Sequence, residues 1–347
     1  MEKYDAKQIR IQRINALIKQ LHDEGIYVIA RLTVFQDPRL AKARPDLAIH
    51  SKTRTHADST RTDAENKLSF SSSTLWLDHK GLAWIDPASK EAWNYNIAIA
   101  KEAASRGFDE LNFDYIRFAS DGNLSDMQFP FWQNTRTDAD GTRTHAETKS
   151  ETIKNFFEEL RESLPDVKIS ADLFGLATAE QDDLGIGQII EDAYEYFDYV
   201  APMVYPSHYA SGFLNFQNPA NYPYEVVKYS MERALQRLKN YELGIMNNAT
   251  TANSTSTNLE LKTKNLKLKT KLRPWLQDFD LGADYTAEMV KKEIQAVYDS
   301  FCSPAATGGR GAQICSPSQT ELGDKFGGWM LWNPSNVYTE EALIKEQ

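Results

Sequence analysis

The chain has 347 residues, enough for one large domain or two ordinary ones, and hydrophobic residues make up 41% of it, which allows a substantial core. Its formal net charge of −10 argues against a nucleic-acid partner and against an anionic membrane surface, and leaves neutral or cationic substrates open. No apolar run is long enough to span a membrane, and residues 1–20 are a charged segment of helical pattern, not a signal peptide.

Helical and strand patterns alternate along the chain. Apolar residues at helical spacing predict a first helix over residues 5–24, ended by Gly25, and a β-rich apolar run then predicts a strand over residues 26–35. The alternation continues with helices predicted over residues 89–106, 151–164, 187–196, 223–239 and 286–301, and strands over residues 110–118, 167–174, 199–205, 272–279 and 328–332.

This alternation predicts the fold class. Six strands that alternate with helices and are apolar on both faces indicate an α/β fold with a parallel sheet. Polar and aromatic side chains gather at the C-terminal ends of the strands, where a (β/α)8 TIM barrel carries its active site. A doubly wound open sheet is the alternative, but no Gly-rich phosphate loop follows any strand. We therefore expect a single barrel domain over residues 1–347.

Two hydrophilic segments are nearly identical in sequence. Residues 53–67 read TRTHADSTRTDAENK and residues 135–149 read TRTDADGTRTHAETK, with eleven of fifteen positions identical; residues 251–262 retain a degraded form. These Thr-rich segments lack periodic apolar residues and cannot bury a core face. We expect low-complexity insertions in surface loops at about residues 51–74, 133–150, 250–271 and 302–320. We predict that the three related segments are poorly packed and that deleting them costs little stability.

Several blocks carry a resemblance to a known family. The segment GFDELNFDYIRFASDG at residues 107–122, with further blocks at residues 26–38, 172–188, 198–209, 273–279 and 328–336, resembles the putative glycosyl hydrolase domain family, a bacterial and archaeal group of TIM-barrel proteins. The resemblance implies a glycoside hydrolase that cleaves glycosidic bonds of a polysaccharide or oligosaccharide without a cofactor. It also favours an extracellular or cell-envelope location.

The resemblance implies one departure from the family pattern. A family member carries two more strands before the first helix seen here, so we expect a (β/α)8 barrel that lacks its first two strands. Either the gene starts upstream of Met1, with any signal segment in the missing part, or the barrel is reduced to six strands.

Three aspartates are candidate catalytic residues. Glycoside hydrolysis usually needs two carboxyl groups, one protonated and one ionised. Asp114, Asp172 and Asp278 lie at or near predicted strand ends, and we expect the pair to be drawn from them. Each has a structural alternative; Asp172, for example, can form an Asx turn before Gly175. No Glu occupies a strand end, which leaves a retaining or an inverting course open.

Candidate substrate-binding residues occupy the same strand ends. Arg117 can pair with the carboxylate of Asp114 or Asp172 and favour its ionised form, or it can form a salt bridge that has no role in catalysis. The same two alternatives apply to Arg31. Trp332 can stack on the C–H face of a sugar or belong to the core. The full set of predicted binding residues is Arg31, Arg117, Tyr205, His208, Gln277, Trp332 and Asn333.

Two other functions compete with hydrolysis by carboxylates. A non-catalytic carbohydrate-binding barrel would keep the aromatic and polar groups without a tuned acid. A metal-dependent hydrolase could use Asp114, Asp172, Asp278 and His208, but their spacing forms no compact metal motif. Cys302 and Cys315, the only cysteines, flank a Gly-rich loop and form either a local disulfide or two free thiols.

Overall fold

The computed structural model describes residues 11–53, 72–133, 136–137, 143–144, 147–252, 268–302 and 323–343. The chain divides into two compact units, the first made of Met1–Ser170 with Asp182–Gln188 and the second of Ala171–Gln181 with Ile189–Gln347. Among the residues described, no helix is long and apolar enough to cross a membrane.

All six predicted strands form. Neighbouring strands in the sheet follow one another in chain order without reversal, which is the order of a (β/α)8 barrel, whereas a doubly wound sheet reverses its order. The registers of β1 with β3, β8 with β10 and β10 with β11 are parallel, which confirms the predicted α/β class. In order, the strands are β1 (Ile29–Thr33), β3 (Glu110–Asp114), β7 (Ile169–Phe174), β8 (Tyr199–Met203), β10 (Trp275–Gln277) and β11 (Met330–Trp332), with a short β9 (Lys271–Leu272) beside β8.

The six predicted helices form as well. A further short helix, α2 (Pro38–Ala43), was not expected from periodicity; the Asp37 side chain caps it by accepting from the backbone N–H groups of its first turn, and Pro38 suits its first position. The predicted helices are α1 (Ile14–Asp23), α4 (Lys90–Ser105), α5 (Lys149–Ser163), α6 (Ile190–Tyr194), α7 (Pro223–Ala252) and α9 (Ala287–Phe301).

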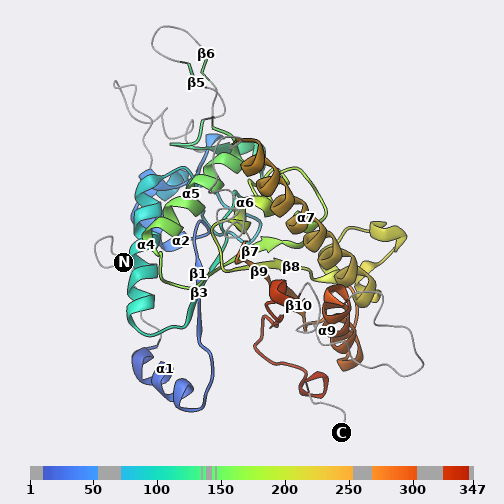
Figure 1. The fold of residues 1–347 in the computed structure, drawn as a ribbon. Coiled ribbons are helices and arrows are strands. Elements are labelled where there is room, and N and C mark those ends of the chain that lie inside the picture. The colour runs from blue at the N-terminus through green and yellow to red at the C-terminus, as the bar shows by residue number, and fades with distance from the viewer. Residues whose placement is uncertain are drawn as a thin grey trace, which may run out of the picture. The chain divides into compact units, whose positions relative to one another are not determined.

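In the first unit, the parallel pair β1 and β3 is accompanied by the helices α4 and α5, which contact each other (Figure 1). Phe156 of α5 packs against Phe35 and Trp93, with ring centroids 5.2 and 5.4 Å away. Two short antiparallel pairs are added: β2 (His50–Ser51) with β4 (Met127–Gln128), and β5 (Arg136–Thr137) with β6 (Arg143–Thr144).

Strand β3 ends four residues earlier than predicted, because the backbone turns directly after Asp114. Tyr115 has a φ of 54°, in the left-handed region that residues with a side chain seldom adopt. The carbonyl groups of Asp114 and Tyr115 still accept hydrogen bonds from Val34 and Phe35, at 3.0 and 3.2 Å. Asp114 is therefore the last residue of the strand.

In the second unit, α7 and α9 pack against each other (Figure 1). The corner after β7 requires glycine at position 175, since a Cβ there would lie 2.5 Å from the Met203 carbonyl oxygen and 2.6 Å from the Tyr209 hydroxyl. At the end of α9, Cys302 is disulfide-bonded, which contradicts the free-thiol alternative for this residue; Cys315 lies outside the described residues.

The repeated segments are described only in part. Residues 54–71 and 253–267 lie outside the described ranges, and so does the loop at residues 303–322. The second copy contributes the hairpin of β5 and β6, and its end forms the start of α5. There Thr148 accepts a hydrogen bond from the backbone N–H of Glu151 at 3.1 Å, and the Glu151 carboxylate accepts from the Thr148 N–H at 2.7 Å. This reciprocal capping box gives the end of the repeat a defined structural role.

Candidate functional site

Asp114 lies buried at the C-terminal end of β3, with 4% of its surface exposed. Its carboxylate forms an ion pair with Arg31 of β1 and accepts a hydrogen bond from the backbone N–H of Tyr115 at 2.6 Å. Since Arg31 and Thr33 are two residues apart on β1 and Thr33 is opposite Asp114, the guanidinium reaches along one face of the strand pair. The structure thus brings together two predicted site residues, Arg31 and Asp114.

Arg117 lies buried beside this pair and among aromatic rings. Its guanidinium is 4.9 Å from the ring centroid of Trp84 and 5.3 Å from that of Tyr115, and it donates to the Phe118 carbonyl oxygen at 3.0 Å and to Ser120 Oγ at 3.1 Å. Burial lowers the pKa of Arg117, and the nearby Asp114 carboxylate opposes that change. Arg117 is therefore held by ring faces and by local oxygen atoms.

Asp78 is a buried carboxylate that the sequence reasoning missed. It accepts hydrogen bonds from Gln36 Nε2 at 2.8 Å, from Trp84 Nε1 at 3.0 Å and from two backbone N–H groups of the following turn, both at 2.9 Å. Burial acts against its ionised form, but these four bonds hold the pKa of Asp78 below its usual value. Trp84 in turn meets Tyr115 edge to face at 5.7 Å. The apolar run LAWID at residues 82–86 was the available signal for Trp84.

In the second unit, Asp172 lies on β7 with 2% of its surface exposed. Its carboxylate accepts a hydrogen bond from Trp275 Nε1 of β10 at 2.7 Å. The ring of Trp275 meets that of Trp332, on β11, edge to face at a centroid distance of 5.9 Å. The structure therefore combines one predicted carboxylate with two half-buried indole rings from three strands.

Asp278 is buried directly after β10 and binds the C-terminal part of the chain. Its two carboxylate oxygens accept from the hydroxyl and the backbone N–H of Thr339, at 2.7 and 2.8 Å. Its carbonyl oxygen accepts from the side-chain amide of Asn333. Asp278 and Asn333 thus join the segment after β10 to the segment after β11.

Gln277 is fully buried at the end of β10, and its hydrogen bonds connect this strand end to neighbouring segments. Its side-chain oxygen accepts from the backbone N–H of Ser207 at 3.2 Å, and its own backbone N–H donates to the Glu293 carboxylate at 2.8 Å. Glu293 also accepts from the Tyr285 hydroxyl, and burial raises the pKa of Glu293 well above its usual value. Sequence reasoning missed Glu293, although position 293 falls on the apolar side of the helix predicted over residues 286–301.

Tyr205 and His208 form an aromatic cluster with Phe279. The ring centroid of Tyr205 lies 5.2 Å from that of His208 and 5.6 Å from that of Phe279. Tyr205 is buried, whereas His208 is exposed. His208 Nδ1 lies 3.1 Å from Ser207 Oγ. The two predicted binding residues are therefore neighbours, with His208 on the solvent side.

The predicted site residues fall into the two units. Within the described ranges, no three His, Cys, Asp or Glu side chains lie close enough together to hold a metal ion. The first unit contains Arg31, Asp114 and Arg117, and the second contains Asp172, Tyr205, His208, Gln277, Asp278, Trp332 and Asn333.

A parallel α/β sheet in unreversed strand order, with buried carboxylates and aromatic rings at the strand ends, defines a protein of the (β/α)8-barrel class. The chain belongs to the family described as "Putative glycosyl hydrolase domain", whose family model matches residues 1–304. This confirms the resemblance seen in the sequence and gives the chain a general glycoside hydrolase role.

Several solved structures are similar to this chain. A hypothetical protein from Ruminiclostridium thermocellum is 31% identical, with 54% of this chain and 80% of that chain covered and a TM-score of 0.34. The PgaB (BpsB) glycoside hydrolase domain from Bordetella bronchiseptica is 13% identical, with 94% and 76% covered and a TM-score of 0.47. The chitinase RmChi1 from Rhizomucor miehei is 10% identical, with 98% and 87% covered and a TM-score of 0.40. No curated protein matches the chain.

Proposed function

We propose that this protein hydrolyses glycosidic bonds of a polysaccharide and that Asp114 supplies the anionic catalytic carboxylate. The observation that carries the proposal is the environment of Asp114, which is buried at a strand end and held by the Arg31 guanidinium and by a backbone N–H. A carboxylate held by a cation and an amide is suited to act as nucleophile or base rather than as proton donor.

Asp172 is the better candidate for the second carboxyl group. Both oxygens of Asp278 are bound by Thr339, so moving Asp278 toward a substrate would break the contact with the C-terminal segment. Asp172 instead accepts from the indole N–H of Trp275, in a pair of indole rings that suits the apolar face of a sugar. Asp278 remains a candidate, and Asp278→Asn in the assay below would show whether it acts in place of Asp172.

The other predicted binding residues divide by exposure and contact. Tyr205, His208 and Trp332 offer ring faces or edges to a sugar. Arg31 holds the catalytic carboxylate, and Arg117 supports Tyr115 next to it. Gln277 and Asn333 act as positioning residues, since their side chains bind backbone atoms of the strand-end loops.

The test is the release of reducing ends from a panel of neutral, cationic and acidic polysaccharides. We expect Asp114→Asn and Asp172→Asn each to lower kcat by about a hundredfold or more, because each removes one member of the carboxyl pair. The control is Asp23→Asn, which changes an exposed aspartate of α1 and should keep full activity. Full activity of Asp114→Asn would contradict the central assignment.

The same panel separates hydrolysis from binding alone. A wild-type protein that binds an oligosaccharide but releases no reducing ends from any member of the panel would be a carbohydrate-binding protein. If it hydrolyses the substrate, the anomer first formed, read by proton NMR, gives the stereochemical course. Retention is typical of carboxyl groups about 5–5.5 Å apart and inversion of carboxyl groups about 6.5–9.5 Å apart.

A further inference from the structure

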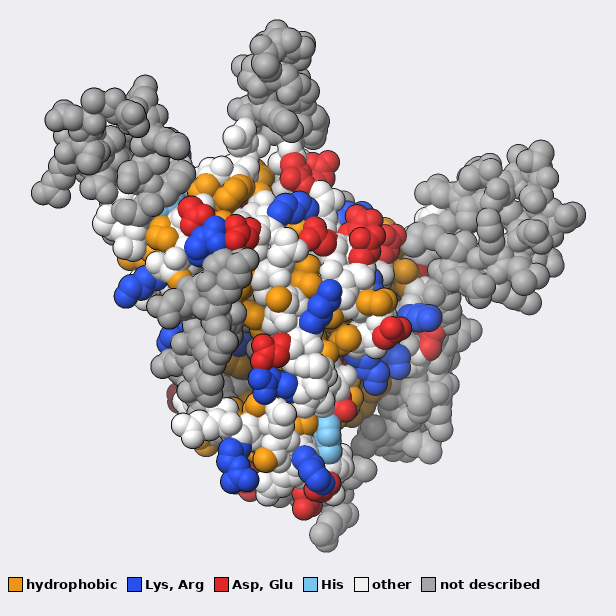
Figure 2. All heavy atoms as spheres, turned by 90° about the vertical axis from the view of Figure 1, so that its left-hand side faces the viewer, with side chains coloured by type: hydrophobic (Ala, Val, Ile, Leu, Met, Phe, Trp, Pro, Cys, Tyr) orange, Lys and Arg blue, Asp and Glu red, His pale blue; other side chains and the backbone are white. Residues whose placement is uncertain are grey.

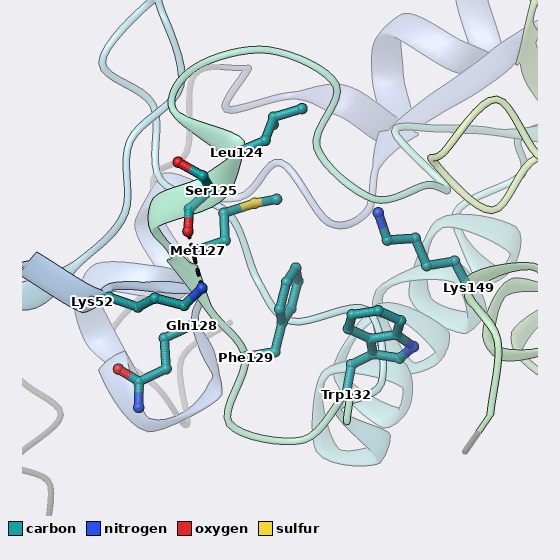
Figure 3. Close-up of a pocket in the computed structure, with 8 residues that line it drawn as sticks. All are labelled: Lys52, Leu124, Ser125, Met127, Gln128, Phe129, Trp132 and Lys149. Atoms are coloured by element: carbon teal, nitrogen blue, oxygen red, sulfur yellow. Dashed lines mark hydrogen bonds between the residues drawn. The ribbon is translucent and has the colours of Figure 1, made fainter. Parts of the chain in front are cut away.

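A pocket of about 430 Å³ lies wholly within the first unit, and none of its lining residues belongs to the candidate site described above. Figure 3 shows its lining, in which Lys52 and Lys149 reach in from opposite sides with the ring of Phe129 between them in this view. The lining residues are Lys52, Leu124, Ser125, Met127, Gln128, Phe129, Trp132 and Lys149.

One wall of the pocket is an aromatic cluster that is stabilised by ring contacts and by hydrogen bonds to a buried carboxylate. The ring centroid of Trp132 lies 5.2 Å from that of Phe129 and 5.3 Å from that of Phe118. The buried Asp86 carboxylate accepts from the backbone N–H groups of Phe131 and Trp132, at 2.7 and 3.0 Å. These contacts fix the Trp132 ring before any ligand arrives, which lowers the entropy cost of binding.

The opposite wall is held by the antiparallel pair β2 and β4. Ser51 is opposite Met127 in that pair, and the Asp126 carboxylate accepts from Ser51 Oγ at 2.5 Å and from the Thr53 N–H at 2.9 Å. Lys52 Nζ donates to the Ser125 carbonyl oxygen at 2.9 Å. The position of the Lys52 ammonium in the pocket is therefore defined.

Both charged side chains of the lining are lysines. Lys149 Nζ donates to the Gly185 carbonyl oxygen at 2.6 Å and lies 5.6 Å from the Trp132 ring centroid. Each ammonium thus donates to a backbone carbonyl oxygen, and the charge of Asp183 also acts on Lys149. Burial lowers the pKa of Lys149, so an anion beside it would offset that cost. Each ammonium has three N–H donors, of which a carbonyl uses one.

The charge of the pocket differs from that of the whole chain. The net charge is −10, and Figure 2 shows acidic and basic side chains interspersed over the face it presents. At physiological salt, charges more than about 8 Å apart are largely screened, so the local charge is set by the two lysines together with the nearby Asp126 and Asp183 and not by the net charge of the chain. The pocket therefore combines an aromatic wall with two ammonium groups, which suits a ligand that has an apolar face and a carboxylate.

We propose that this pocket is an accessory subsite for a carboxylated sugar, a uronic acid residue of the polysaccharide that the protein binds. The inference rests on the proposed glycoside hydrolase function. The C–H face of the pyranose packs on Trp132, and the carboxylate accepts hydrogen bonds from Lys149 and Lys52. The subsite would select acidic glycans or glycans with acidic branches.

The experiment measures binding of a galacturonic acid tetramer and of its fully methyl-esterified form by titration calorimetry. The Asp114→Asn protein is the host, so that the probe is not hydrolysed. We expect the acid form to bind about tenfold more tightly than the ester, and Lys149→Gln and Lys52→Gln each to remove most of that difference. Trp132→Ala should weaken binding of both forms equally. Lys101→Gln, which removes the same charge from an exposed position on α4, is the matched control and should bind as the host does.

Three outcomes would overturn the proposal. The first is equal binding of the acid and its ester; the second is unchanged binding by both lysine variants. The third is displacement of the tetramer by acetate at equal concentration, which shows a site for any small anion. Two lysine variants are used because Lys149 begins α5, and loss of fold in one leaves the other informative. Binding in the pocket without hydrolysis by the wild type would support the subsite and contradict the proposed hydrolase, so the two failures are distinguishable.

Discussion

The buried carboxylates of this protein differ in the partners that hold them, and the partner indicates the role. Asp114 is bound by a guanidinium, Asp78 by four neutral donors, Asp278 by a threonine, and Glu293 by a tyrosine hydroxyl and a backbone N–H. An arginine partner balances a full negative charge. A buried carboxyl group with few neutral donors can be protonated instead, as the raised pKa of Glu293 indicates, whereas the four donors of Asp78 hold its pKa below the usual value.

Replacement of Glu293 by glutamine should change the pH dependence of stability. Burial, and then the nearby Asp278 charge, raises the pKa of Glu293 in the folded protein above the ordinary 4.5. At pH values between 4.5 and the raised pKa, Glu293 holds a proton in the folded state that it has released in the unfolded state. The wild type therefore loses about 1.4 kcal/mol of stability per pH unit as pH rises through this range. Glu293→Gln carries no such proton, and we expect it to gain stability relative to wild type as pH rises above about 4.5.

Guanidinium unfolding at a series of pH values from 4 to 8 checks this prediction. The control is Glu288→Gln, an exposed glutamate in the first turn of the same helix, whose difference from wild type should not change steeply with pH. A difference between Glu293→Gln and wild type that stays constant over the whole range would show that Glu293 is ionised in the folded protein.

At the scale of the elements, periodicity predicted six strands of the sheet and six helices, because an apolar face on each element is required for burial, but it predicted neither α2 nor the separate short strand β9. What it could not predict depends on contacts distant in sequence or on the backbone. The end of β3 depends on the left-handed conformation of Tyr115, which tyrosine seldom adopts. The role of Asp278 depends on Thr339, which lies 61 positions farther along the chain. The pairing of Asp114 with Arg31 was among the predicted alternatives.

The start of α5 offers a test at the same scale. Thr148 forms both halves of a capping box with Glu151, so Thr148→Ala leaves a backbone N–H of the first turn without its side-chain acceptor. We expect a loss of about 1 kcal/mol in the free energy of unfolding, measured in urea. Thr148→Ser keeps the hydroxyl and should remain within a few tenths of a kcal/mol of the wild type. Equal losses in the two variants would show that the threonine methyl group, and not the cap, stabilises the helix.

At the scale of the whole molecule, two of the predicted catalytic aspartates belong to different compact units, Asp114 to the first and Asp172 to the second. The sequence predicts both as site residues from the order of the strands, because unreversed parallel strands bring their C-terminal ends to the same edge of a sheet. It does not predict the hydrogen-bond partners of each aspartate, since those partners lie on other elements. The repeated segments, in contrast, were recognised from sequence identity and composition alone.

The first repeat should be removable without loss of the fold. Residues 54–67 are hydrophilic and lack periodic apolar residues, and the chain on either side is joined directly: Trp76 N–H donates to the Ile49 carbonyl oxygen at 2.9 Å, and His50 bridges to Leu75. We expect that replacing residues 54–67 with a short Gly-Ser linker changes the free energy of unfolding by less than about 1 kcal/mol, because loop length alters the closure entropy only slowly. Urea unfolding followed by tryptophan fluorescence measures it. A variant with the same residues in scrambled order is the control and should match the wild type. A loss of several kcal/mol in both variants would show that this repeat makes specific contacts with the folded units. The prediction of a poorly packed insertion from its hydrophilic composition would then be wrong.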